Sequence, residues 1–138
     1  MINACISNNN FNMTFINAGG LTSQIKTITS KHRECINKDK HTFGKTDIWA
    51  HAGETVNIQC TSLLSIMSTL NIYHIDYFSL DVDGAELFIL QSINWDRLTI
   101  DLFTIETHFD HDNSMTFMTS HGYKWITKVA EDDVDMKE

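Results

Sequence analysis

The chain has 138 residues, of which 42% are hydrophobic, and its formal net charge is −8. This length suits a single domain, and the apolar content excludes a wholly disordered chain. The acidic balance argues against a nucleic-acid partner, because contacts with phosphates need clustered cations.

The first part of the chain predicts short strands beside a long polar segment. Residues 2–6 are mostly apolar, and in residues 11–16 the large apolar side chains of Phe11, Met13 and Phe15 fall at every second position. Both patterns favour short strands. Ala18-Gly19-Gly20 predicts a hairpin or loop turn. Residues 20–54 are polar, and we expect a long loop or insertion there. Its cations indicate a solvated loop or, alternatively, a lid or docking loop for an anionic partner: Lys26, Lys31, Arg33, Lys38, Lys40 and Lys45.

The second part alternates predicted strands with predicted helices. Apolar spacing predicts, in order, a strand at 56–58, a helix capped by Thr61 or Ser62, a strand at 75–82, a helix at 84–93, a strand at 98–106, a helix at 114–121 and a strand at 123–129. Two strand–helix–strand passages predict an α/β fold with a mostly parallel sheet. We expect the acidic tail, residues 131–138, to fray. Asp112 or Asn113 is expected to cap the last helix, and Gly122 to end it.

Carboxylates gather directly after the most apolar strand. Tyr77-Phe78-Ser79-Leu80 is followed by Asp81, Asp83, Gly84 and Glu86. Glycine permits a tight turn, and in open α/β sheets ligands bind at the carboxyl ends of strands. Asp81 is therefore a candidate functional residue, or else a turn cap. Asp83 and Glu86 also fit a capping box at the start of the next helix.

Glu106 and His108 follow the next predicted strand. Side chains two residues apart share one face of a strand, so both are expected near Asp81 if the strands are neighbours. This group favours acid–base chemistry, and the structural alternative is a partly solvated loop edge. A magnesium site or a mixed histidine–carboxylate site is a lesser alternative, and no metal belongs to the expected site. His111 is expected in an exposed loop.

The turn carries a resemblance to a known family. Asp81-Val82-Asp83-Gly84-Ala85-Glu86-Leu87, followed by Ile89-Leu90, resembles the Asp-Val-Glu-Gly-x-Glu-Leu pattern of FkbM-type methyltransferases. Asp83 stands where that family has glutamate. Segments at 2–7, 58–64, 100–106 and 122–123 are similar in the same order, so the resemblance covers most of the chain outside about 20–54. Within the family, the chain looks most like the animal Star-like branch.

The resemblance implies a partial Rossmann-like class I methyltransferase fold. Residues 1–138 would form one incomplete domain that lacks the N-terminal cofactor-binding strands and their glycine-rich loop. In the complete fold, the strand at 75–82 would lie beside the first of those strands, so here its apolar edge would be open. We therefore expect weak or no activity, and poor cofactor binding, from this chain alone.

The resemblance also implies roles for individual residues. The cofactor would be S-adenosylmethionine, and full-length relatives would methylate an oxygen of a small-molecule, glycan or lipid-type acceptor. Asp81 would orient or deprotonate the acceptor, with Glu106 and His108 helping to hold it. Asp81, Asp83 and Gly84 would contact the cofactor.

A Star-like relationship implies a different function, a non-catalytic interaction module with a protein partner in the secretory pathway. It would place the full-length protein at the endoplasmic reticulum or Golgi membrane, whereas the default is cytoplasmic, since the chain predicts neither a signal peptide nor a membrane helix. Cys5, Cys35 and Cys60 fit no zinc motif. Reduced, buried cysteines and a Cys5–Cys60 disulfide are the alternatives. Asn12-Met13-Thr14 is a glycosylation sequon, meaningful only in that pathway.

Overall fold

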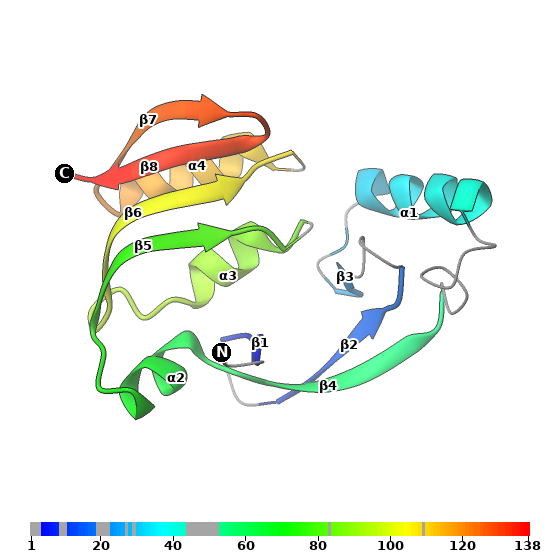
Figure 1. Cartoon of the computed structure of the whole chain (residues 1–138), viewed down its shortest axis with the longest axis horizontal. Coiled ribbons are helices and arrows are strands. Elements are labelled where there is room, and N and C mark those ends of the chain that lie inside the picture. Colours follow the sequence, from blue (N-terminus) through cyan, green and yellow to red (C-terminus); the bar gives the residue numbers. More distant parts are fainter. Residues whose placement is uncertain are drawn as a thin grey trace.

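The computed structural model describes residues 4–8, 11–18, 23–26, 28, 30–43, 53–82, 84–108 and 110–138. Over these residues the fold is mixed α/β, with two four-stranded sheets and four helices (Figure 1). No helix in this part of the chain is both long enough and apolar enough to cross a membrane.

The first sheet contains strands at the places predicted from 2–6, 11–16 and 56–58, and one further strand at 23–24 inside the segment expected to be a loop. Its members are β1 (Cys5–Ile6), β2 (Asn12–Ile16), β3 (Ser23–Gln24) and β4 (Thr55–Thr61). They lie in the order β1-β4-β2-β3, in which β1 is parallel to β4 and β2 is antiparallel to both of its neighbours. The predictions at 11–16 and 56–58 are confirmed, while the turn glycines Gly19 and Gly20 lie outside the described residues.

The polar segment contains a helix where a loop was expected. Helix α1 runs over Ser30–Phe43, so the expectation of a loop throughout 20–54 was wrong. This helix buries Ile36 but has no apolar stripe that periodicity could detect. Its lysine, arginine and glutamate residues favour helix without being apolar. The helix lies beyond the carboxyl ends of β5 and β6 (Figure 1).

The second sheet is mixed and not mostly parallel. Its strands are β5 (His74–Leu80), β6 (Thr99–Glu106), β7 (Tyr123–Val129) and β8 (Asp132–Lys137). Their order is β5-β6-β8-β7, and β8 runs antiparallel to both β6 and β7. The chain enters β8 through a tight turn at Ala130, whose φ is 56°. The tail expected to fray is therefore an interior strand, and this strand makes the sheet mixed.

Three more helices follow the predicted pattern closely. They are α2 (Leu63–Thr69), α3 (Glu86–Ser92) and α4 (His111–Ser120). Ser62 caps α2 by accepting a hydrogen bond from the Ser65 N–H at 3.0 Å. The predicted caps of the last helix were wrong, because α4 begins at His111 after the N-cap Asp110. Gly122 follows its end with a φ of 78°, as expected for a helix stop.

The main core lies between the second sheet and helices α3 and α4, which lie against one face of it (Figure 1). Trp95 is partly buried and packs against this core, with ring contacts to Phe103, Phe117 and Tyr123. The Trp95 indole also donates to the Leu90 carbonyl oxygen at 3.1 Å. Trp95 therefore packs against the helix that precedes it, α3. Strand β5 lies at one end of this sheet within the described residues, so its edge position also agrees with the prediction.

Two acids of β8 point into the protein, which explains why this strand escaped prediction. The Asp133 and Asp135 side chains are fully buried. Neither carboxylate oxygen of Asp135 has a hydrogen-bond partner among the described residues. Burial, followed by the charge of Asp133, raises the pKa of Asp135 to about 6. A buried carboxyl without partners costs less when it is neutral, so the folded protein favours its protonated form.

We expect Asp135 to make the protein less stable as the pH rises. The unfolded chain has an ordinary pKa near 3.8, and the folded value is about 6. This contribution to stability is present in full below the unfolded pKa and is lost as the pH rises through the folded pKa. The loss amounts to at most about 3 kcal/mol. Asp135→Asn should remove this part of the pH dependence in urea unfolding curves.

The matched control is Asp96→Asn, because Asp96 is exposed in the connector after α3. It should keep the pH dependence of the parent protein. An Asp135→Asn variant with the parent's pH dependence would contradict the role given to Asp135.

Candidate functional site

Three carboxylates meet at the carboxyl ends of β5 and β6, and we call this group the acid rim. Asp81 follows β5, Glu106 ends β6, and Glu86 begins α3. One oxygen from each carboxylate lies within 4.8 Å of the others. The predicted approach of Asp81 and Glu106 is therefore confirmed, because β5 and β6 are parallel neighbours. Glu86, for which the sequence favoured a helix cap, joins them.

Glu86 holds the turn between β5 and α3. Its carboxylate is buried, and Oε1 accepts hydrogen bonds from the N–H groups of Val82 at 2.9 Å and Gly84 at 3.1 Å. Gly84 has a φ of 94°, a conformation that other residues rarely adopt. The expected capping box is not the one that opens α3 among the described residues, since the N-cap is Ala85, which makes no side-chain cap hydrogen bond. Asp83 lies outside the described residues.

Glu106 is the member of the acid rim that ends strand β6. Its Oε2 atom is buried without a hydrogen-bond partner among the described residues. Burial raises the pKa of Glu106, and the negative charges of Glu86 and Asp81 raise it further. The hydrogen bond from the His108 N–H lowers this pKa, but by less than the other effects raise it. A carboxyl group with a raised pKa can hold a proton and donate it in a hydrogen bond. The acid rim can therefore both accept and supply protons.

His108 contacts the acid rim through its main chain. Its N–H donates to Glu106 Oε1 at 3.1 Å, while its Nδ1 atom lies 3.7 Å from Glu131 Oε2. Strand β6 ends at Glu106, so the alternation of side chains along a strand does not extend to His108. Lys31 of α1 donates to the His108 carbonyl oxygen at 3.1 Å, which ties α1 to this loop.

A cavity of about 810 Å³ opens beside Asp81. Asp81, Val82 and Ala85 line it on the side of the turn, and strands of the first sheet contribute Met13 and Phe15 opposite. Its volume lies within the range of small-molecule sites, which are mostly apolar with a few polar groups. Asp81 is thus a carboxylate at the border of a largely apolar space.

A disulfide joins the first sheet beside this cavity. Cys5 and Cys60 are bonded, with their Cα atoms 4.4 Å apart, and Cys35 is a free thiol. The two bonded residues stand opposite each other in the parallel pair β1 and β4. Of the two alternatives that the sequence left open, the structure contains the disulfide.

A second polar group surrounds Asp133 and was missed by the sequence analysis. Asp133 accepts hydrogen bonds from Thr107 at 2.6 Å, His111 at 2.7 Å and the Trp125 indole at 2.9 Å. Burial alone would raise the pKa of Asp133, but these three bonds outweigh it and lower the pKa. His111, expected in a loop, is thereby held against the sheet. No local signal identifies these partners, which come from three separate elements.

We expect Glu86→Gln to lower the pKa of Glu106. The substitution removes the like charge that contributes most, and the amide oxygen can still accept from the N–H groups of Val82 and Gly84. Burial remains, so the pKa should stay above its ordinary value. Carbon-detected NMR titration of the Glu106 carboxyl measures the change, and Asp112→Asn on α4 is the charge-matched control. An unchanged Glu106 pKa in Glu86→Gln would show that the acid rim is not electrostatically coupled.

Comparison with known proteins agrees with the resemblance seen in the turn. Residues 2–125 match the model of the methyltransferase FkbM domain. Searches of curated proteins and of solved structures found no match. Methyltransferases of this family use S-adenosylmethionine, so a methyltransferase-like function follows from membership. Because the match covers most of its length, the chain belongs to the FkbM methyltransferase domain family.

Proposed function

We propose that this domain transfers a methyl group from S-adenosylmethionine to an oxygen atom of its acceptor. The observation that carries the proposal is the position of Asp81, which belongs to the acid rim and also borders the 810 Å³ cavity. A hydroxyl group placed there would lie beside a carboxylate, with an apolar space for the remainder of a ligand. This combination suits proton removal from an acceptor hydroxyl.

The proposed reaction needs little covalent chemistry from the protein. S-adenosylmethionine supplies a methyl group on a sulfonium that is already reactive, so positioning provides most of the rate increase. Asp81 would orient the acceptor hydroxyl and take its proton as the new carbon–oxygen bond forms and the methyl–sulfur bond breaks, with the electron pair of that bond leaving on the neutral thioether sulfur. Glu106 holds the acceptor by a hydrogen bond that its raised pKa allows. His108 contributes by fixing Glu106 through its main-chain N–H.

The proposed cofactor contacts come from the turn after β5. Gly84 has no side chain, so the backbone can approach a ligand closely, and Asp81 and Asp83 offer carboxylates to its hydroxyl or amino groups. Glu86 keeps this turn in one conformation by its two hydrogen bonds. Contacts from a single turn give few anchoring points, so we expect weak binding. The acceptor we propose is a small hydroxyl compound, or one of glycan or lipid type.

A titration with S-adenosylmethionine, followed by amide NMR, tests the cofactor site even when binding is weak. Chemical-shift changes should centre on the turn at Gly84 and Ala85 and on residues that line the cavity. Changes confined to other surfaces, or no changes at all, would contradict the proposed site. Calorimetry on the same sample gives the affinity, and micromolar binding would contradict the expectation that it is weak.

Transfer of a labelled methyl group to hydroxyl acceptors tests the role of Asp81. Asp81→Asn should lower the rate by roughly 100-fold or more, the usual contribution of a general base. Asp96→Asn removes the same charge from an exposed connector and should leave the rate unchanged. A fully active Asp81→Asn variant would exclude Asp81 as the base.

One observation favours a second function, a Star-like interaction module of the secretory pathway. The Cys5–Cys60 disulfide is typical of proteins from oxidising compartments and rare in the cytosol. We propose that in this case the domain binds a protein partner and has no catalytic role. Alkylation of the protein in intact cells, followed by mass spectrometry, tests the compartment on which this second function depends. Full protection of both cysteines favours the secretory pathway, and full alkylation favours the cytosol.

A further inference from the structure

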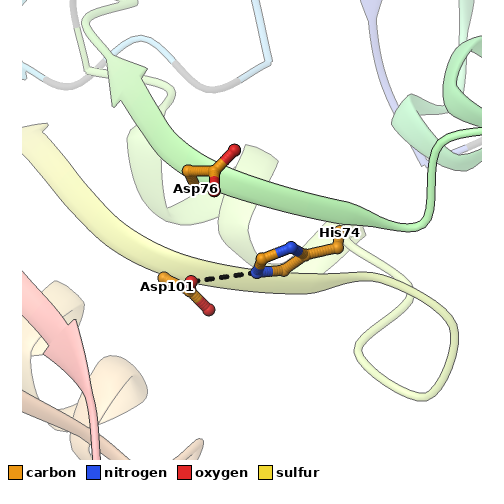
Figure 2. Close-up of side chains that lie close together, drawn as sticks. All are labelled: His74, Asp76 and Asp101. Atoms are coloured by element: carbon orange, nitrogen blue, oxygen red, sulfur yellow. Dashed lines mark ion pairs between the residues drawn. The ribbon is translucent and has the colours of Figure 1, made fainter.

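A separate group of metal-ligating side chains lies at the other end of β5 and β6, and we call it the His74 cluster. His74 and Asp76 come from the start of β5, and Asp101 comes from the start of β6. Figure 2 shows the three side chains side by side on the two strands. One potential ligand atom from each lies within 4.8 Å of the others. Asp76 and Asp81 are five positions apart, which is roughly 16 Å along a strand. The His74 cluster is therefore distinct from the acid rim.

The strand register brings two like charges together in the His74 cluster. Ile75 pairs with Ile100 and Tyr77 with Leu102, so Asp76 stands opposite Asp101. Like charges directly opposite each other on neighbouring strands destabilise a sheet. His74 Nε2 lies 2.9 Å from Asp101 Oδ2, whereas Asp76 has no ion pair with the described residues. The cluster therefore has an excess of negative charge that a bound cation would offset.

The donor set indicates which cation fits. One imidazole nitrogen and two carboxylate oxygens are ligands that zinc accepts, at about 2.0–2.2 Å from the ion. Ligand atoms within 4.8 Å of one another are compatible with such bond lengths after small side-chain rotations. Imidazole favours zinc-type ions over magnesium and calcium, which prefer oxygen alone. The acid rim, with three carboxylates, has the opposite preference.

We propose that His74, Asp76 and Asp101 form a binding site for a divalent ion of the zinc type. Three protein ligands leave the fourth position of a tetrahedral ion for water or for a donor from another molecule. Binding requires the neutral imidazole and releases a proton wherever His74 is protonated. Since β5 lies at one end of the sheet within the described residues, the ion would fasten this strand to β6. The strands are regular elements, so the backbone positions of the three ligands are fixed relative to one another.

Zinc calorimetry on the full chain tests the site, in a Cys35→Ser background that removes the free thiol. We expect one zinc ion to bind and to raise the melting temperature, because only the folded chain holds the three ligands together. Loss of an outer partner of a metal ligand already costs roughly 10–100-fold in affinity, so His74→Ala and Asp101→Asn should cost at least that much. Asp76→Asn should weaken binding and therefore reduce the zinc-dependent rise in melting temperature.

Two control variants separate this site from other sources of zinc affinity. Asp96→Asn and Glu106→Gln should bind zinc as the Cys35→Ser protein does, because neither residue belongs to the His74 cluster. The proposal is overturned if the Cys35→Ser protein binds no zinc. It is equally overturned if His74→Ala retains full affinity, or if Glu106→Gln removes the binding. Circular dichroism of each variant without zinc confirms that it is folded.

Discussion

The parallel pairing of β5 with β6 is the interaction on which the rest of the structure depends. The register from His74–Thr99 to Leu80–Ile105 places the inward side chains of both strands against α3 and α4. Phe78 and Phe103, for example, meet edge to face with their ring centroids 5.6 Å apart. The same register brings the ends of the two strands level. It therefore produces the acid rim at one end and the His74 cluster at the other.

The fold buries several carboxyl groups beside its apolar core, and burying a charged carboxylate is unfavourable unless hydrogen bonds compensate for it. Glu86 shows how one residue can serve both demands, since its buried carboxylate fixes the turn and also raises the pKa of Glu106. Asp133 is comparable, because three hydrogen bonds keep it charged within the fold. Asp135 receives no such compensation. Buried acids in this protein are thus tolerated to different degrees, according to how many donors reach them.

Much of the second half of the fold could be predicted, because its strands and helices carry apolar patterns. The strands at 75–82 and 98–106 gave the neighbouring carboxyl ends from which the meeting of Asp81 and Glu106 followed. Strand β3, helix α1 and strand β8 could not be predicted from such patterns. Helix α1 is almost entirely polar, and β8 directs aspartates inward where a strand normally directs apolar residues. The contacts of Asp133 could not be foreseen either, because the strand that carries it had been taken for a tail.

The Cys5–Cys60 bond has a consequence for the chain between its two sulfur atoms. It closes a loop with a sequence separation of 55, which contains β2, β3 and α1. Restricting the unfolded chain in this way contributes about 4 kcal/mol in the chain-entropy model. The bond also changes the outcome of proteolysis, because one cut within the enclosed loop leaves two peptides that remain covalently joined. Such a nicked protein would migrate as one species on a gel until a reductant separates the halves.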